Sequence, residues 1–175
     1  MVLLMWALEV VDAALDNRLD RHGIEPRDVD GLDGVVAAPF LHVGFGHLLA
    51  NTVPFVAMGL VIALEGPLRL LGVTAIATVV SGLGTWLIAP ADTIHLGASG
   101  VVFGYATYLI ARGWFNRRPM QIAIGVVVAL LWGGALLAGI EPQQGISWQG
   151  HLFGAIGGVV AARILSERRE SGRSI

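Results

Sequence analysis

Long apolar stretches separated by short polar turns are the feature of this sequence that most restricts its possible folds. A helix needs about 20 mostly apolar residues to cross a membrane. Six stretches approach that length, at about residues 1–15, 47–64, 68–89, 99–111, 120–140 and 147–165. Only 14% of the residues are charged, whereas soluble domains average about 25%. The sequence therefore predicts an all-α membrane protein, a compact bundle of six membrane-spanning helices.

The six stretches leave few residues over, so residues 1–166 are predicted to form one domain, followed by an Arg-rich cytoplasmic tail at 167–175. The first stretch is short, contains Glu9 and Asp12, and has neither a basic start nor a small-residue cleavage site. Because a signal peptide has both features, we interpret this stretch as a span that lacks its N-terminal part. The segment from about 16 to 46 is predicted to be an external loop, long enough to be functional.

The arginines indicate the orientation, because cytoplasmic loops of membrane proteins are enriched in Arg and Lys. Arginines follow the second and fourth stretches and fill the tail: Arg69, Arg112, Arg117, Arg118, Arg168, Arg169 and Arg173. The external loop instead contains more acids than arginines. We therefore expect a multi-pass protein of the cell (inner) membrane with both termini in the cytoplasm.

Charge and cysteine content exclude several classes of function. The formal net charge is −2, so no broad basic face is available to bind nucleic acid. Without cysteine, the chain can form neither a disulfide nor a thiolate zinc site nor an iron–sulfur cluster. The lipid bilayer is the partner that the composition predicts.

Three polar residues on separate predicted helices are expected at one depth. Ser99, Asn51 and His151 precede an inner charge of their spans by 13, 14 and 12 residues. At a rise of about 1.5 Å per residue, each lies about 20 Å above the cytoplasmic boundary. Polar groups at such a depth are costly and usually functional.

The fourth stretch is too short to cross the membrane, so its helix is expected to begin inside it, at Ser99. The chain then dips into the membrane between Pro90 and Gly97, where irregular backbone needs cover from protein or water. We therefore expect a water-filled cavity, with the active site opening to the outside. His22 and His95 are expected to be loop residues at the outer surface.

Ser99 lies in the motif Gly97-Ala98-Ser99-Gly100. At a helix start, free backbone N–H groups and the helix dipole favour negative charge, which suits a nucleophile and the oxyanion that it creates. The flanking glycines permit a tight turn. The alternative interpretation is a Ser N-cap between packing glycines, because serine is a favoured N-cap.

His151, Gly154 and Gly158 fall on one face of the sixth predicted helix, at positions i, i+3 and i+7. Small residues let membrane helices approach closely, and Gly100 and Gly104 offer a matching strip on the fourth. Such an approach would allow a Ser–His hydrogen bond of about 2.6–3.2 Å. The alternative is a packing seam with a lone interfacial histidine.

His42, His47 and Asn51 form a third motif at the second predicted helix. His47 and Asn51 are four residues apart and share one face, and both can donate a hydrogen bond to an oxyanion. His42 precedes the helix and is expected to hold the loop. A metal site formed by His42, His47 and His151 is the alternative, but the spans have no carboxylate at that depth and the sequence has no HExxH motif.

Together, the three motifs resemble those of the rhomboid family of intramembrane serine proteases. The family pattern has two His and an Asn at the second span, Gly-x-Ser-Gly opening the fourth, and His with Gly at +3 and +7 on the sixth. The matching residues, within about 31–162, are His42, His47, Asn51, Gly97, Ser99, Gly100, His151, Gly154 and Gly158. The resemblance implies a six-helix bundle that cleaves transmembrane or membrane-proximal segments of other proteins.

The sequence departs from the family pattern in two places. Many members have a Trp-Arg pair in the first loop, which this chain lacks, although Gly23-Ile24-Glu25-Pro26-Arg27 resembles a bacterial subgroup. Four residues after Ser99, where a Tyr often stacks on the catalytic His, this chain has Phe103. Phe can stack but cannot hydrogen-bond, so a looser orientation of His151 is expected.

The motifs and the resemblance predict Ser99 as the nucleophile and His151 as the general base of a dyad, since no acid is placed to complete a triad. The Ser99 N–H, Asn51 and His47 are expected to stabilise the oxyanion. Neither a cofactor nor a metal is implied. Expected substrates are membrane proteins with a helix-destabilised transmembrane segment, which enter laterally as the fifth span and the loop at 139–145 move.

Two other classes of function remain open. A catalytically inactive rhomboid-like protein would bind membrane proteins without cutting them, and the intact Ser99 and His151 argue against it. A small transporter or channel would more naturally contain inverted repeats, and the sequence has no internal repeat.

Overall fold

The computed structural model describes residues 1–143 and 145–166, so the predicted tail at 167–175 lies outside the described residues. The described part contains seven α-helices and three 3-10 turns. The helices are α1 Val2–Ala14, α2 Gly34–Ala37, α3 Gly44–Ala63, α4 Pro67–Ile88, α5 Ser99–Asn116, α6 Pro119–Gly139 and α7 Trp148–Ile164. The 3-10 turns are η1 Asp20–His22, η2 Asp30–Leu32 and η3 Ala38–Phe40.

Within the described residues, α3, α4 and α6 are long and apolar enough to cross a membrane. α1 has 13 residues and α7 has 17, fewer than the roughly 20 that a spanning helix needs. The predicted class, an all-helical membrane protein, is therefore confirmed. The count of six spans is not confirmed by the length and composition of the helices.

α5 begins at Ser99 as expected, but it has 18 residues and runs past 111, so the short fourth helix is not confirmed. The prediction placed the membrane boundary at Arg112. In the structure, Arg112 is only 2% exposed, and its guanidinium lies 2.6 Å from a carboxylate oxygen of Glu65. Arg112 is therefore not the end of the helix, which continues to Asn116 and is terminated by Arg117 with a left-handed φ of 53°.

The turns between consecutive helices follow local sequence signals. Gly66 adopts a φ of 110°, which side chains rarely allow, and Pro67 then opens α4. Pro119 opens α6 in the same way after Arg117. Proline fits the first position of a helix because its missing N–H would have no partner there. These signals make α3–α4 and α5–α6 tight helical hairpins.

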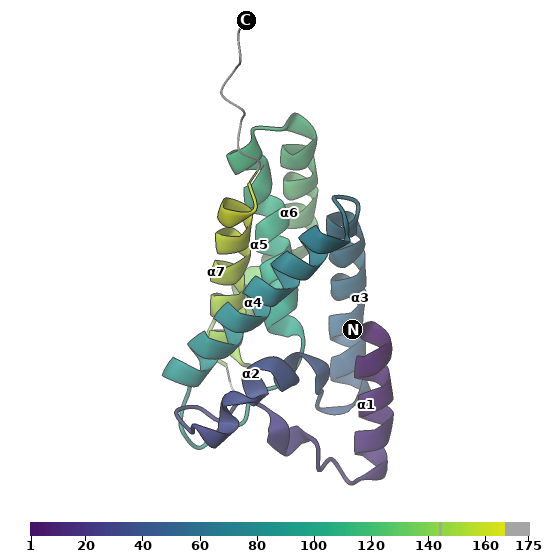
Figure 1. Ribbon diagram of the computed structural model, residues 1–175, viewed down its shortest axis with the longest axis vertical. Helices are drawn as coiled ribbons and strands as arrows, with labels where there is room; N and C mark the ends of the chain where they lie inside the picture. Colours follow the sequence, from purple (N-terminus) through teal and green to yellow (C-terminus); the bar gives the residue numbers. More distant parts are fainter. Residues whose placement is uncertain (144, 167–175) are drawn as a thin grey trace, which may run out of the picture.

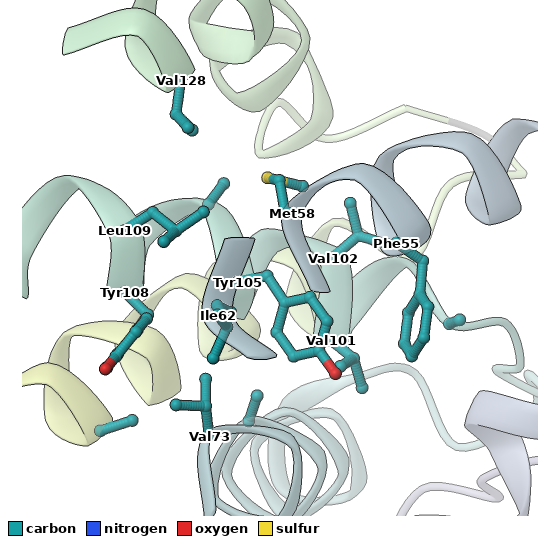
Figure 2. Close-up of a cluster of buried hydrophobic side chains, with 14 of the residues drawn as sticks. Phe55, Met58, Ile62, Val73, Val101, Val102, Tyr105, Tyr108, Leu109 and Val128 are labelled. Carbon is teal, nitrogen blue, oxygen red and sulfur yellow. The ribbon is translucent and has the colours of Figure 1, made fainter. Parts of the chain in front are cut away.

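α5 is the central helix and contacts α3, α4, α6 and α7 (Figure 1). α4 crosses the bundle obliquely, and α1 lies beside α3. Figure 2 shows the core that α5 forms with its neighbours, including Met58, Ile62, Val73, Tyr105 and Leu109. Because lipid is as apolar as these side chains, close van der Waals packing holds such helices together.

α5 and α7 touch along their glycines. A Cβ atom at Gly154 would lie 2.8 Å from the carbonyl carbon of Gly100, and one at Gly158 would lie 2.8 Å from that of Gly104. Both distances are shorter than any real Cβ contact. The strip of small residues expected from the spacing therefore lets the two backbones meet, with Ser99 and His151 at one end of it.

The segment at 16–46 is folded against the ends of other elements. The Arg27 guanidinium donates hydrogen bonds to the carbonyl oxygens of Leu87 and Ala89, at 3.3 and 2.7 Å, and so caps the end of α4. Ile24 and His95 exchange two backbone hydrogen bonds. The motif at 23–27 thus docks the loop on α4 and on the segment that leads to Ser99.

Candidate active site

Ser99 and His151 come together where α5 and α7 begin. Ser99 is the first residue of α5, and His151 lies in the first turn of α7. The Ser99 Oγ is 2.8 Å from Nε2 of His151. The chain enters α5 through Gly97, whose φ of 114° favours glycine. The turn at Gly97 and the glycine contact between α5 and α7 thus bring the Ser99 hydroxyl within hydrogen-bond distance of the His151 imidazole.

Two neighbours fix the orientation of the His151 ring. Its Nδ1 lies 2.8 Å from the backbone carbonyl oxygen of Gly139, the last residue of α6. A carbonyl oxygen can only accept, so Nδ1 carries the proton and Nε2 has a lone pair for the Ser99 hydroxyl. Phe103 stacks on the ring, with 4.2 Å between centroids and an angle of 9° between planes. The carbonyl stands where a triad would have its carboxylate.

His47 and Asn51 of α3 line the same cavity as Ser99 and His151. The side-chain amide of Asn51 donates one hydrogen bond to the His47 carbonyl oxygen, at 3.1 Å, and has a second N–H to offer. The Val43 N–H donates to Nδ1 of His47 at 3.4 Å, so the neutral His47 ring carries its proton on Nε2. The site therefore contains two side-chain donors beside the Ser99–His151 pair.

Gly97 and Gly100 leave room for these side chains. A Cβ at Gly97 would lie 2.7 Å from Cε1 of His47, so the imidazole packs directly on the turn before Ser99. A Cβ at Gly100 would collide with the Ser81 hydroxyl and lie 3.1 Å from the Gly150 carbonyl oxygen. Both glycines of the serine motif are thus required by close contacts.

The cavity in front of the pair has a volume of about 1210 Å³. Apolar residues of α3, α5 and α6 form much of its wall, among them Met58, Val102 and Trp132. The residues that precede α5 and α7 also line it. The volume exceeds the roughly 300–1,000 Å³ of a small-molecule site, so the cavity can take several residues of a peptide.

His42 lies behind the site, not on the cavity wall. It is 2% exposed, and its Nε2 accepts the Ala98 N–H at 3.3 Å, just before Ser99. Burial first, and then the nearby charge of His47, lower the pKa of His42 to about 4. Among residues 1–143 and 145–166, no group of three or more His, Asp or Glu side chains is arranged to hold a metal ion, and His42, His47 and His151 are no exception.

Sequence reasoning missed Gly139 and Ser81. Gly139 acts through its backbone oxygen, and a sequence has no signal for such a role. The Ser81 hydroxyl of α4 donates to the Gly150 carbonyl oxygen at 2.7 Å, one residue before His151. A serine in the middle of an apolar helix could have been singled out as a polar contact of this kind.

A family model, described as the rhomboid domain, matches residues 31–168. The chain belongs to the rhomboid family. All three motifs of the site lie inside the matched range, as does Gly139. Membership of the rhomboid family and the long apolar helices α3, α4 and α6 together identify this chain as a membrane protein.

Several proteins are similar to this rhomboid chain. Rv1337 of Mycobacterium tuberculosis, an uncharacterized protein, is 42% identical over 182 residues, which cover 99% of this chain and 76% of that protein. YdcA of Bacillus subtilis, provisionally named a rhomboid protease, is 31% identical over 74% of this chain and 65% of its own length. Rhomboid-like protein 11 of Arabidopsis thaliana, a chloroplast protein, is 29% identical over 75% of this chain and 52% of its own.

Proposed function

We propose that this chain is an intramembrane serine endopeptidase that cleaves transmembrane or membrane-proximal segments of membrane proteins with a Ser99–His151 dyad. One observation carries the proposal: Ser99 Oγ lies 2.8 Å from His151 Nε2, while Nδ1 of the same ring donates to a carbonyl oxygen. A neutral imidazole that accepts the serine proton activates the oxygen as a nucleophile.

In the proposed reaction, Ser99 Oγ attacks the carbonyl carbon of the scissile peptide bond, and its proton passes to Nε2 of His151. The C–N bond then breaks, and His151 gives that proton to the leaving amine. Water gives a proton to Nε2 of His151 and attacks the acyl carbon; the bond from that carbon to Ser99 Oγ then breaks, and His151 returns the proton to Oγ, which releases the new carboxyl group and the free serine. The Gly139 carbonyl accepts the Nδ1–H throughout, so the ring keeps one orientation.

The negative charge on the tetrahedral intermediate needs donors that are already in place. The Ser99 backbone N–H lies at the free start of α5. The second N–H of Asn51 and the Nε2–H of His47 belong to the same cavity wall. We assign these three groups to the oxyanion, and loss of one such donor typically lowers kcat by about 10²–10³.

We also propose that the bundle crosses the inner membrane six times, with both termini in the cytoplasm and the cavity open to the outside. Substrates are membrane proteins whose transmembrane segment unwinds locally, because a helical peptide bond is shielded by its neighbours. Entry is lateral, past α6. Only 11% of the spanning window of α6 is buried, against 33% for α3 and α4, so α6 is the least enclosed of these three helices.

Purified full-length protein in detergent, incubated with a generic single-pass membrane substrate, tests the proposal. Wild type should cleave it, and Ser99→Ala and His151→Ala should not, because each removes one member of the dyad. Ser166→Ala is the matched control, since its hydroxyl donates to the Arg163 carbonyl oxygen at the far end of α7, away from Ser99 and His151. Equal turnover by wild type and folded Ser99→Ala would refute the assignment.

An inactive rhomboid-like binder is the alternative, and chemical labelling separates the two. A fluorophosphonate reacts with a serine only where a base activates it. Labelling of wild type but not of Ser99→Ala supports the protease. A folded wild-type protein that binds a membrane substrate, is not labelled and does not cleave supports the binder.

A further inference from the structure

A second hydroxyl–imidazole contact joins the same two chain segments as the Ser99–His151 pair. His95 Nδ1 lies 2.8 Å from Ser147 Oγ. His95 is four residues before Ser99, and Ser147 is four residues before His151, so each contact joins residues 52 apart in the sequence. The residue types are reversed: here the imidazole precedes α5 and the hydroxyl precedes α7.

The hydrogen bonds around His95 fit one arrangement of protons. The Thr93 hydroxyl donates its single proton to the Pro90 carbonyl oxygen, at 2.6 Å. Thr93 can then only accept from His95 Nε2, which lies 2.8 Å away. Burial lowers the pKa of His95, which favours the neutral ring. With Nε2–H donated to Thr93, Nδ1 accepts the proton of the Ser147 hydroxyl.

His95 is also held by its backbone. Its carbonyl oxygen accepts the Ile24 N–H at 2.8 Å, and its N–H donates to the Ile24 carbonyl at 3.0 Å. The residue therefore connects the loop at 16–46 with the segment that leads to Ser99. Through Ser147, it also connects both to the start of α7.

The hydroxyl of Ser147 is available for this contact. Ser147 occupies the N-cap position of α7, but within the described chain its side chain makes no capping hydrogen bond. Its carbonyl oxygen accepts the His151 N–H at 3.1 Å, so a single helical turn separates the two residues. A displacement of Ser147 is therefore carried directly to His151.

We propose that His95 and Ser147 are positioning residues, which tie the segment before Ser99 to the first turn of α7 and so set the Ser99–His151 distance. The proposal rests on the protease function proposed above. Neither residue touches the reacting atoms. Both line the cavity, so the tie also closes one side of the space that receives the substrate.

A double-mutant cycle tests the tie, with kcat and KM measured for the full chain in detergent on a single-pass substrate. His95→Ala and Ser147→Ala should each lower kcat by about 10- to 100-fold, because sub-ångström to ångström misplacement of a catalytic group has costs of this order. KM should change little. The double variant should lose no more than the worse single variant, since both remove the same contact.

Two further variants distinguish loss of the His95–Ser147 contact from general destabilisation of the protein. Ser147→Thr keeps the hydroxyl and should recover most of the loss that Ser147→Ala causes. His22→Ala removes an exposed histidine from the external loop and should have the wild-type kcat. Unchanged kcat in His95→Ala, or losses that simply add in the double variant, would overturn the proposal.

If wild type cleaves no faster than Ser99→Ala, the proposed protease function fails. The His95–Ser147 contact is then tested by the thermal midpoints of wild type, His95→Ala, Ser147→Ala and the double variant. Midpoint shifts that do not add support a contact between His95 and Ser147, and additive shifts overturn it.

Discussion

Gly154→Ala is the substitution whose effect follows most directly from the geometry. The added Cβ would lie 2.8 Å from the Gly100 carbonyl carbon, whereas ordinary Cβ contacts begin at 3.4 Å. The helices α5 and α7 must therefore separate by at least 0.6 Å at this point, the difference between the two distances. The carbonyl oxygen of Gly100, which lies closer still, makes this a lower bound.

The separation acts on the proposed dyad because Gly154 is one helical turn from His151 and Gly100 follows Ser99. A shift of 0.6 Å along the 2.8 Å contact would stretch it to about 3.4 Å, beyond the usual limit of about 3.2 Å. General-base catalysis contributes about 10²–10⁴ to a rate. Partial loss of it should lower kcat by at least about tenfold, and overpacking should cost about 1–3 kcal/mol of stability.

The assay is cleavage of a single-pass substrate together with the thermal midpoint in the same detergent. Gly134→Ala on α6 is the matched control, because a Cβ there would meet nothing within 4 Å among the described residues. Its kcat should stay at the wild-type value. Gly158→Ala meets the same kind of clash one turn farther from His151, so it should lose similar stability but less kcat. Wild-type kcat and midpoint in Gly154→Ala would refute the reasoning.

Three further predictions concern single side chains, one of them far from the site. Glu65→Ala leaves the buried Arg112 guanidinium without its carboxylate and should cost about 3–5 kcal/mol by chemical unfolding, whereas adding Arg112→Leu should recover only part of it, because Tyr108 and Gln121 also donate to Glu65. The pKa of His42 is about 4 in the folded protein and 6.5 in the unfolded chain, so the unfolded chain takes up the proton first as the pH falls. The free energy of unfolding should therefore be constant above pH 6.5 and decrease by about 3 kcal/mol as the pH drops to 4. His42→Phe should reduce this acid sensitivity, measured as midpoint against pH, and an unchanged slope would contradict the cause. Phe103→Leu removes the stacking on His151, worth about 0.5–1.5 kcal/mol, and should lower kcat by up to about tenfold, whereas Phe103→Tyr should not.

Much of the candidate site was predictable because each residue lies in a short local motif. The spacing of His151, Gly154 and Gly158 places them on one helix face whatever the rest of the fold does. The same holds for His47 and Asn51. The motif Gly97-Ala98-Ser99-Gly100 likewise predicts a tight turn and a helix start by local rules alone, although Ala98, not Ser99, is the N-cap of α5. Periodicity and composition were also sufficient for the all-helical membrane class.

Other features depend on what lies beside a residue, and a sequence does not contain that information. Arg112 was placed at a membrane boundary, since a lone charge there is the cheapest arrangement. Its pairing with Glu65, 47 residues away in the chain, allows it to lie inside the bundle and lets α5 continue. His95 was expected to be an outer loop residue, and its contact with Ser147 depends on how two loops fold together.

The sequence by itself determined the all-helical membrane class, the start of α5 at Ser99 and the chemistry of the motif residues, because these follow from the order of residues along one segment. Only the tertiary structure decided that the Gly139 carbonyl orients His151, that His95 contacts Ser147, and that Arg112 pairs with Glu65. Those facts join segments that are distant in the chain. A backbone oxygen is the same in every residue, so its role is set by position in space alone.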